Sequence, residues 1–255
     1  MNPVDADELS LLVDLHGRQA RQGPGSDDQT RKAIDLAGLR DRSGLRIADV
    51  GCGTGSSTMV LAELPDSVIT AVDMVPAFLS ELNRRAVNQG CAERVSTVEG
   101  QLQDLPFTDG SLDVIWAEGA IYSIGFSAGV QSWWRFLTPG GVLAVSEITW
   151  LTDERPLAIE EFWTAEYPEI GTASQKFAAL EANGYSPLGY FTLPPRCWWE
   201  EYYRPLAEQF EEFLTRHPHS ESAQAIVSAE REEMELFDAY GAWYGYGFYI
   251  ARRVP

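Results

Sequence analysis

Short apolar runs alternate with amphipathic stretches along the first 150 residues. Runs typical of buried strands occupy residues 45–50, 68–73, 94–99, 111–117 and 142–148. Between the second and third runs, Phe78, Leu82 and Ala86 share one helical face, with Pro76 before them and Gly90 after them. Strands that alternate with helices of this size predict right-handed crossovers and a mainly parallel sheet.

The pattern is less regular on either side of the fifth strand and after Trp150. We predict a helix at 128–137, a Thr-Pro-Gly-Gly turn at 138–141, a helix at 173–182, a strand at 185–193, an interrupted helical stretch at about 200–239 and a closing strand at 242–252. In the closing strand, Tyr244, Tyr246, Phe248 and Ile250 alternate with smaller residues.

Composition limits the class of protein. A chain of 255 residues with 45% hydrophobic and 22% charged content fits one large α/β domain. The sequence shows neither a signal-peptide pattern nor an apolar stretch of membrane-spanning length, so we expect a cytoplasmic protein without a membrane partner. Cys52, Cys91 and Cys197 are widely separated, and this spacing indicates neither a disulfide framework nor a metal site.

The charge argues against a polyanionic partner. The formal net charge is −19, and Lys32 and Lys176 are the only lysines in the sequence. A protein that grips nucleic acid needs clustered cations. We therefore expect no nucleic-acid partner and favour a small substrate that is neutral or cationic.

A glycine-dense turn follows the first strand. Gly51, Gly53 and Gly55 are spaced G-x-G-x-G, and Ser56 stands where a dinucleotide turn would carry its third glycine. The turn could be a tight connection that binds nothing. Three glycines cost backbone entropy that a simple turn would not require, so we favour a ligand role.

Five motifs then occur in order: DVGCGTGSST at 49–58, the acid Asp73, VEGQLQDLPF at 98–107, LDVIWAEGAIYSIGF at 112–126 and FLTPGGVLAVSE at 136–147. Together they resemble the motifs of class I S-adenosylmethionine-dependent methyltransferases. The WAEGAIY segment and the upstream RQGPGSDDQT are similar to a bacterial subgroup of small-molecule methyltransferases, of methyltransferase type 11. The subgroup pattern does not fix a substrate.

The resemblance implies a fold and a domain plan. The fold would be α/β and doubly wound, with a mainly parallel, Rossmann-like, seven-stranded sheet whose antiparallel end holds 185–193 and 242–252. One methyltransferase domain would cover 1–255. Residues 1–30 would form a lid, and 151–184 and 195–239 would be helical cap insertions. A homodimer is an open expectation.

The resemblance also assigns cofactor contacts. The glycines 51, 53 and 55 would approach the methionine part of S-adenosylmethionine, and Asp49 would face its ammonium group. Asp49 could instead order the glycine turn. Asp73 would accept the ribose hydroxyl protons, or it could cap the following helix.

Other contacts depart from the family pattern or have alternatives. Met74 would lie against the adenine, or in ordinary core. Gln101 stands where many relatives have Asp, and its carbonyl oxygen could still accept from the adenine amine, with Leu102 beside it. From the lid, Arg21 or Gln22 would meet the cofactor carboxylate, although a flexible linker also explains that segment.

Catalysis would involve the loop after the fourth strand. Glu118 would accept a proton from the nucleophile or pair with a substrate amine, unless it only holds the loop at 119–125. His16 is a second candidate base, although a histidine on a helix surface is the commoner case. Tyr122 and Phe126 would line the substrate side of the site and offer aromatic faces to the sulfonium cation of the cofactor.

Tryptophans outside the motifs are candidate substrate contacts. Trp150, Trp163 and Trp198 would line a pocket for a partly apolar acceptor, or form the core of an inserted lid. The implied reaction moves a methyl group to an oxygen, nitrogen, sulfur or carbon nucleophile and leaves S-adenosylhomocysteine. The alternatives are an RNA methyltransferase, a non-catalytic protein that binds either cofactor form, and an NAD(P)-dependent oxidoreductase.

Overall fold

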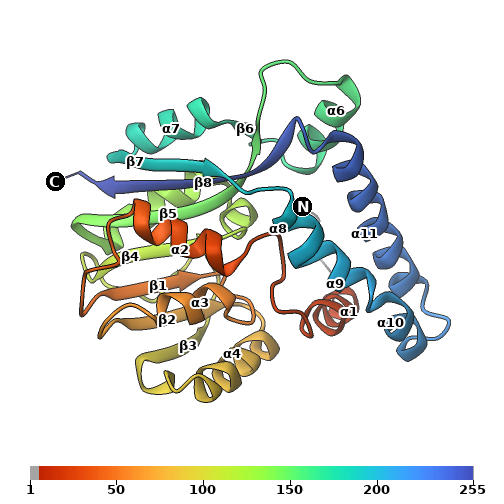
Figure 1. Cartoon of the computed structure of the whole chain (residues 1–255), viewed down its shortest axis with the longest axis horizontal. Coiled ribbons are helices and arrows are strands. Elements are labelled where there is room, and N and C mark those ends of the chain that lie inside the picture. The colour runs from red at the N-terminus through yellow and green to blue at the C-terminus, as the bar shows by residue number, and fades with distance from the viewer. Residues whose placement is uncertain (1–5, 255) are drawn as a thin grey trace.

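The computed structural model describes residues 6–254, which form a central sheet with helices on both faces and a helical cap at one edge (Figure 1). The strands are β1 (Arg46–Val50), β2 (Val68–Asp73), β3 (Val95–Glu99), β4 (Leu112–Glu118), β5 (Leu137–Trp150), β6 (Gly171–Thr172), β7 (Tyr185–Thr192) and β8 (Tyr244–Arg253). Their order is β3-β2-β1-β4-β5-β8-β7, with β6 beside β5.

The topology is doubly wound, as the sequence predicted. β1 to β5 pair in parallel, whereas β8 runs antiparallel between β5 and β7. The two late strands therefore form the antiparallel end. The sheet has eight strands where seven were predicted, because the two-residue β6 pairs with the end of β5.

Alternate strand residues face two separate cores. Ile47 belongs to the core that holds α2 (Asp27–Leu36), α3 (Ser56–Leu61) and α4 (Pro76–Asn88). Its neighbour Ala48 faces the opposite core, which holds α5 (Phe126–Trp133) and α7 (Ala173–Ala182). Strands buried on both faces explain the continuous apolar runs in the sequence.

The segment before the fifth strand differs from the prediction. The expected turn at 138–141 lies within β5, and the preceding helix ends at Trp133, followed by η3 (Trp134–Phe136). Leu112 pairs with Leu137 and Val114 with Val142, so a bulge absorbs the extra residues of β5. The turn-forming glycines are thus used inside a strand.

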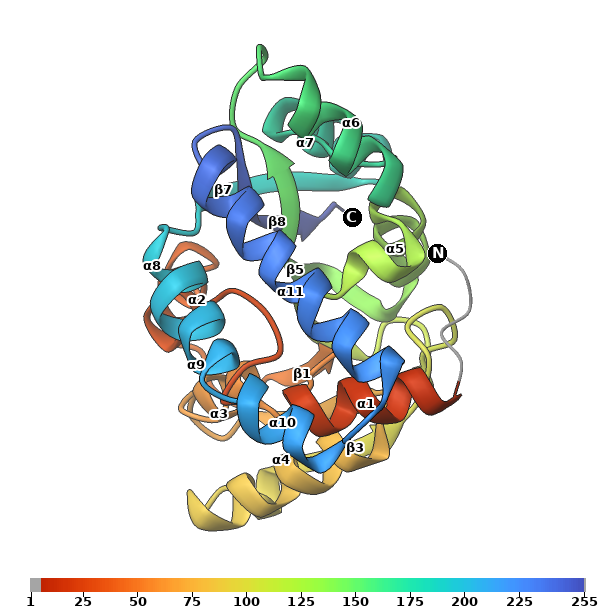
Figure 2. The ribbon, with the colours of Figure 1, turned by 90° about the vertical axis from the view of Figure 1, so that its right-hand side faces the viewer.

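A helical cap covers the carboxyl ends of the parallel strands. It contains α1 (Ala6–His16), α6 (Leu157–Glu166), α8 (Arg196–Trp198), η4 (Trp199–Tyr203), α9 (Arg204–Ala207), α10 (Phe210–Arg216) and α11 (Glu221–Tyr240). Figure 2 shows α11 crossing this side of the molecule, with α1 and α10 beside its first turns. An aromatic-rich core joins these helices to the ends of β5 and β8.

The lid and cap boundaries of the domain plan stay predictions. Residues 1–5 and 255 lie outside the described residues. Within the predicted lid, α1 is part of the cap and packs against α10 and α11. In contrast, α2 packs against α3 and the sheet. Two connecting 3-10 turns, η1 (Ala92–Arg94) and η2 (Ile121–Ile124), complete the elements.

The helices are too short or too polar to cross a bilayer. The longest, α11, has 20 residues but carries many acidic side chains. Within residues 6–254, no helix combines the length and the apolar character of a membrane span.

Candidate active site

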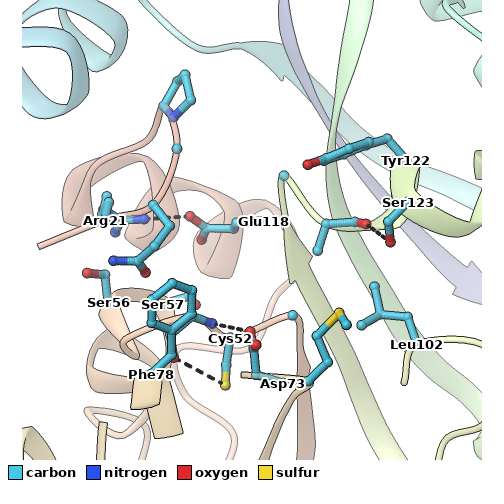
Figure 3. A pocket seen from close by; sticks show the side chains of 18 residues that line it. Arg21, Cys52, Ser56, Ser57, Asp73, Phe78, Leu102, Glu118, Tyr122 and Ser123 are labelled. Atoms are coloured by element: carbon cyan, nitrogen blue, oxygen red, sulfur yellow. Dashed lines mark hydrogen bonds and ion pairs between the residues drawn. The ribbon is translucent and has the colours of Figure 1, made fainter. Parts of the chain in front are cut away.

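A cavity of about 250 Å³ lies at the carboxyl ends of β1, β2 and β4, and we call it the loop cavity. Its lining combines the glycine loop after β1, the acid that ends β2, the loop after β4 and residues 21–24 (Figure 3). Open α/β sheets bind ligands at this edge, beside the point where the strand order reverses.

The glycine loop packs tightly against two other segments. Gly51 and Gly53 have φ angles of +70° and +53°, which favour glycine. A Cβ on Gly53 would collide with the Gln22 amide, and one on Gly51 with the methyl group of Ala120. The missing side chains therefore let both segments close on the loop. Gly55 is the N-cap of α3, faces α4, and lies outside the cavity lining.

Asp73 presents its carboxylate to the loop cavity. Oδ2 accepts a hydrogen bond from the Gly53 N–H at 2.8 Å, and Oδ1 accepts one from the Val75 N–H at 2.9 Å. Burial raises the pKa of Asp73. Asp73 is not the N-cap of α4, because that position is Val75 and no side chain caps the helix. Each carboxylate oxygen of Asp73 keeps a further lone pair, and its contact with the ribose hydroxyls stays a prediction.

Asp49 lies behind the loop rather than in the cavity lining. The hydroxyls of Ser57 and Thr58 donate to its Oδ2 at 2.8 and 2.6 Å. Its Oδ1 has no hydrogen-bond partner among the residues that the structure describes. Burial raises the pKa of Asp49 to about 7. The carboxyl group thus holds the first turn of α3 through side-chain hydroxyls, and not through the loop N–H groups.

Arg21 and Glu118 form an ion pair on the wall of the loop cavity. Arg21 Nη1 donates to Glu118 Oε2 at 2.8 Å (Figure 3). Arg21 Nη2 donates to Asp27 Oδ1 at 2.9 Å. The Thr30 hydroxyl and the Trp116 indole donate to Glu118 Oε1 at 2.7 and 2.9 Å. Side chains of the pair are only 9% and 11% exposed. Three donors therefore fix Glu118, and its function as a base stays a prediction.

The N-terminal segment is anchored over the glycine loop. Gln22 Oε1 accepts from the Thr54 N–H at 2.8 Å. On the other side, Arg85 of α4 donates to the carbonyl oxygens of Ala20 and Gln19 at 2.9 and 2.8 Å. These bonds hold Arg21 and Gln22 beside the cavity, where the sequence predicted them.

Part of the lining of the loop cavity is apolar. Met74, Phe78 and Leu102 contribute side chains to the lining. Gln101 is exposed and lies outside the lining, and its Oε1 accepts from Gln103 Nε2 at 2.6 Å. The side chain of Gln101 therefore engages its own loop.

A second cavity of about 230 Å³ adjoins the first, and we call it the aromatic chamber. The residues common to both linings are Gln22, Gly23, Pro24, Gly119 and Tyr122. The aromatic residues of the chamber lining are Tyr122, Trp163, Tyr167, Trp198, Tyr202 and Tyr246. These residues come from η2, the cap and β8, so the chamber lies between the cap and the sheet.

The predicted substrate and base residues divide between the chamber and the core. Tyr122, Trp163 and Trp198 line the chamber. In contrast, Phe126 and Trp150 are 1% and 5% exposed and belong to packed cores outside both linings.

His16 lies behind the chamber wall. Its Nε2 is 3.2 Å from Glu230 Oε1, and its ring stacks near Tyr202 with centroids 6.3 Å apart. It lies outside both cavity linings, and its catalytic function stays a prediction.

Sequence reasoning missed several residues of these sites. Thr30 ends the RQGPGSDDQT segment but was not assigned a function, and Phe78 was read only as part of an apolar helix face. Glu233 of α11 lines the chamber, but it lies among several glutamates of one helix, and only the fold distinguishes it from them.

Comparisons with known proteins identify a methyltransferase domain in part of the chain. Residues 47–141 match the family model described as a methyltransferase domain. This range includes the glycine loop, Asp73 and the loop after β4, whereas the cap lies beyond it.

Two curated relatives match about half of the chain. The chain is 34% identical over 134 residues to a malonyl-[acyl-carrier protein] O-methyltransferase of Dechloromonas aromatica, covering 50% of this chain and 48% of that protein. It is 30% identical over 146 residues to a 27-O-demethylrifamycin SV methyltransferase of Amycolatopsis mediterranei, covering 54% of each. The chain thus spans about half the length of these relatives.

A solved structure extends the likeness to the whole fold. A SAM-dependent methyltransferase from Geobacter sulfurreducens in complex with S-adenosyl-L-homocysteine superposes with a TM-score of 0.81, at 19% identity. The match covers 95% of this chain and 97% of that one, so the cap is included. The fold is therefore that of the Rossmann-like class I methyltransferases.

Proposed function

We propose that this protein transfers a methyl group from S-adenosylmethionine to a small-molecule acceptor. The observation that carries the proposal is the shared wall of the loop cavity and the aromatic chamber, formed in part by Gly119 and Tyr122. A donor in the first cavity and an acceptor in the second would meet there. The match of residues 47–141 to a methyltransferase domain supports this arrangement.

The loop cavity has groups suited to the nucleoside part of the cofactor. Asp73 offers carboxylate oxygens to the two ribose hydroxyls at the end of its strand, as acids in related α/β folds do. Met74, Phe78 and Leu102 offer apolar surface to the adenine ring. Gln101 is not required for this fit.

The charged wall suits the amino-acid end of the cofactor. That end carries an ammonium and a carboxylate, and the Arg21–Glu118 pair presents one charge of each sign. The two charges are held by Asp27, Thr30 and Trp116, so little reorganisation is needed on binding. We therefore assign to Glu118 the positioning of Arg21 and contact with the ammonium group, with proton acceptance as the alternative.

Residues at the junction would position the reacting groups. S-adenosylmethionine supplies, when bound, an electrophilic methyl group on a positively charged sulfur. Tyr246 lies against the junction, since a Cβ on Gly119 would be 3.5 Å from the Tyr246 hydroxyl. Tyr122 and Tyr246 line the chamber and offer aromatic surface to positive charge.

The size of the chamber and the net charge support a small acceptor. A chamber of about 230 Å³ accommodates a small molecule or a short chain. A net charge of −19 disfavours RNA. Relatives act on acceptors as different as an acyl-carrier-protein-bound malonyl group and a rifamycin, so their names leave the acceptor open. Membership of the WAEGAIY subgroup is part of this proposal.

Calorimetric titration tests the cofactor class. We expect S-adenosylhomocysteine and S-adenosylmethionine to bind, and NADH to give no heat of binding. Tight NADH binding without either sulfur nucleoside would overturn the proposal. Retention of the protein on RNA at physiological salt would instead overturn the small-acceptor part.

A further inference from the structure

Aromatic rings form much of the wall of the aromatic chamber. Trp198 and Tyr246 stack with ring centroids 5.2 Å apart and an interplanar angle of 26°. Tyr122 and Tyr167 meet edge to face at 6.3 Å, and Trp163 lies on the same lining. Rings from separate elements thus surround one space of about 230 Å³.

The charged groups of this wall are all acidic. Glu166 and Glu233 line the chamber, and no lysine, arginine or histidine is part of the lining that residues 6–254 provide. The nearby Lys176 is already paired, with its Nζ 3.2 Å from Glu147 Oε1. An anionic acceptor would therefore find negative charge without a compensating cation.

Glu233 is the more buried of the two carboxylates, since it is half-buried and Glu166 is exposed. The Tyr203 hydroxyl donates to Glu233 Oε1 at 2.8 Å and fixes the side chain. Burial, together with the charge of Glu230, raises the pKa of Glu233 to about 7. A carboxyl group with such a pKa exchanges a proton readily near neutral pH.

Tyr246 connects this carboxylate to the junction between the cavities. Burial, with the nearby Tyr122 and the charges of Glu233 and Glu147, raises the pKa of Tyr246. Tyr246 lines the same chamber as Glu233 and also lies against Gly119. A ligand between Glu233 and the junction would contact both the aromatic rings of the chamber and the Glu233 carboxylate.

We propose that the acceptor is a basic amine, held as its ammonium form by the rings of the aromatic chamber and by Glu233, and methylated at nitrogen. The proposal rests on the proposed function, because it names the acceptor class of that reaction. Aromatic faces around a cation, backed by a carboxylate, form the usual recognition site for ammonium groups. Acceptors that carry a carboxylate or phosphate near the reacting atom are disfavoured by Glu166 and Glu233.

The chemistry of the step balances with the groups present. The ammonium N–H bond breaks and its proton moves to the Glu233 carboxylate, which leaves a lone pair on nitrogen. That lone pair forms the new N–C bond while the C–S bond breaks and its electron pair stays on sulfur as a thioether. The amine product carries the positive charge, and Glu233 then releases one proton to solvent per methyl group transferred.

Three ligands of one shape test the charge preference. Choline, 3,3-dimethylbutan-1-ol and 3,3-dimethylbutanoate carry positive, zero and negative charge on a similar branched framework. Each is titrated by calorimetry into protein saturated with S-adenosylhomocysteine. We expect choline to bind at least about tenfold more tightly than the alcohol, and the acid to bind most weakly. Equal affinities, or a preference for the acid, would overturn the proposal.

Glu233→Gln and Glu232→Gln form a matched pair of variants. Glu232 is the exposed neighbour on the same helix, and both substitutions remove one negative charge. A Gln at 233 keeps an oxygen that can accept from Tyr203. We expect Glu233→Gln to weaken choline about tenfold and leave the alcohol unchanged, and Glu232→Gln to alter neither. An equal effect of both variants would show that only net charge matters and would overturn the function of Glu233.

The first titration also separates this inference from the proposed function. Failure of S-adenosylhomocysteine to bind would contradict the proposed function itself. Normal binding of S-adenosylhomocysteine together with no preference for choline would contradict only the amine assignment.

Discussion

The loop cavity and the aromatic chamber share a wall but are built in different ways. The loop cavity takes its polar groups mainly from the ends of neighbouring parallel strands, each within a short motif. The chamber collects rings from η2, the cap helices and β8, which the fold alone brings together. Groups that follow adjacent strands are placed by the topology, whereas groups on the cap are placed by tertiary packing.

The carboxylates of the two regions differ in the same way. Asp73 accepts two backbone hydrogen bonds, and Glu118 accepts from Arg21, Thr30 and Trp116. Glu233 accepts from Tyr203 on an otherwise acidic and aromatic wall. We infer that the charged groups of the loop cavity are held in place before a ligand binds, whereas Glu233 of the aromatic chamber is available to pair with a ligand. The predictions below test this contrast.

Arg21→Met should have the largest effect. It leaves Glu118 buried without its charge partner, so we expect the free energy of unfolding to fall by about 3 kcal/mol in urea denaturation. Arg21→Met combined with Glu118→Gln should recover about half of that loss. The control Arg31→Met breaks an exposed pair with Glu63 and should cost less than about 0.5 kcal/mol. Equal losses for Arg21→Met and Arg31→Met would contradict a preorganised pair.

Asp73→Ala should reduce cofactor affinity strongly. Loss of a carboxylate that accepts from two ribose hydroxyls predicts about 100-fold weaker binding of S-adenosylhomocysteine by calorimetry. Glu99 pairs in register with Asp73 at the end of β3 and is exposed, which makes Glu99→Ala a matched control. Similar affinities for the two variants would remove Asp73 from the cofactor site.

Asp49→Asn should change the pH dependence of stability. Burial raises the pKa of Asp49 to about 7, so the folded protein retains a proton that the unfolded chain loses near pH 4. Stability due to this group is therefore present at low pH and falls as pH rises from about 4 to about 7.

Asn at 49 keeps an acceptor for Ser57 and Thr58 but does not ionise. We expect the decline in unfolding free energy between pH 5 and pH 7.5 to shrink by about 2 kcal/mol in urea titrations. The exposed Asp109→Asn serves as control. A wild-type pH profile in Asp49→Asn would contradict the buried, protonated carboxyl group.

Gln101→Ala should have the smallest effect. Its side chain engages Gln103 outside the loop cavity, so we expect less than about a twofold change in S-adenosylhomocysteine affinity. Met74→Ala removes apolar surface from the lining and should weaken binding about fivefold. A larger effect from Gln101→Ala than from Met74→Ala would contradict this placement, because it would put the adenine against the Gln101 side chain.

Much of the sheet could be predicted from the sequence because its strands are buried on both faces. The runs at 45–50 and 68–73 correspond to β1 and β2 within one residue. The turn predicted at 138–141 was wrong, since Gly140 and Gly141 serve a bulge within β5. A Gly-Gly pair can form a turn that ends a strand or a bulge within a strand, and the local sequence does not distinguish the two.

The candidate site could be predicted only where a motif fixed it. Asp73 follows its strand and lies in the cavity lining, as expected from the sequence. Phe126 and Trp150 were predicted by the same reasoning but are buried in packed cores, Phe126 in the first turn of α5 and Trp150 at the end of β5. Glu233 was not identifiable, since its neighbours on α11 have the same composition.

A crystal structure of the protein with S-adenosylhomocysteine tests the central claim most directly. The account predicts both ribose hydroxyls within hydrogen-bond distance of the Asp73 carboxylate, the amino-acid end beside Arg21 and Glu118, and the sulfur directed toward Tyr122 and the aromatic chamber. A nucleoside bound elsewhere, or a sulfur directed away from the chamber, would contradict it.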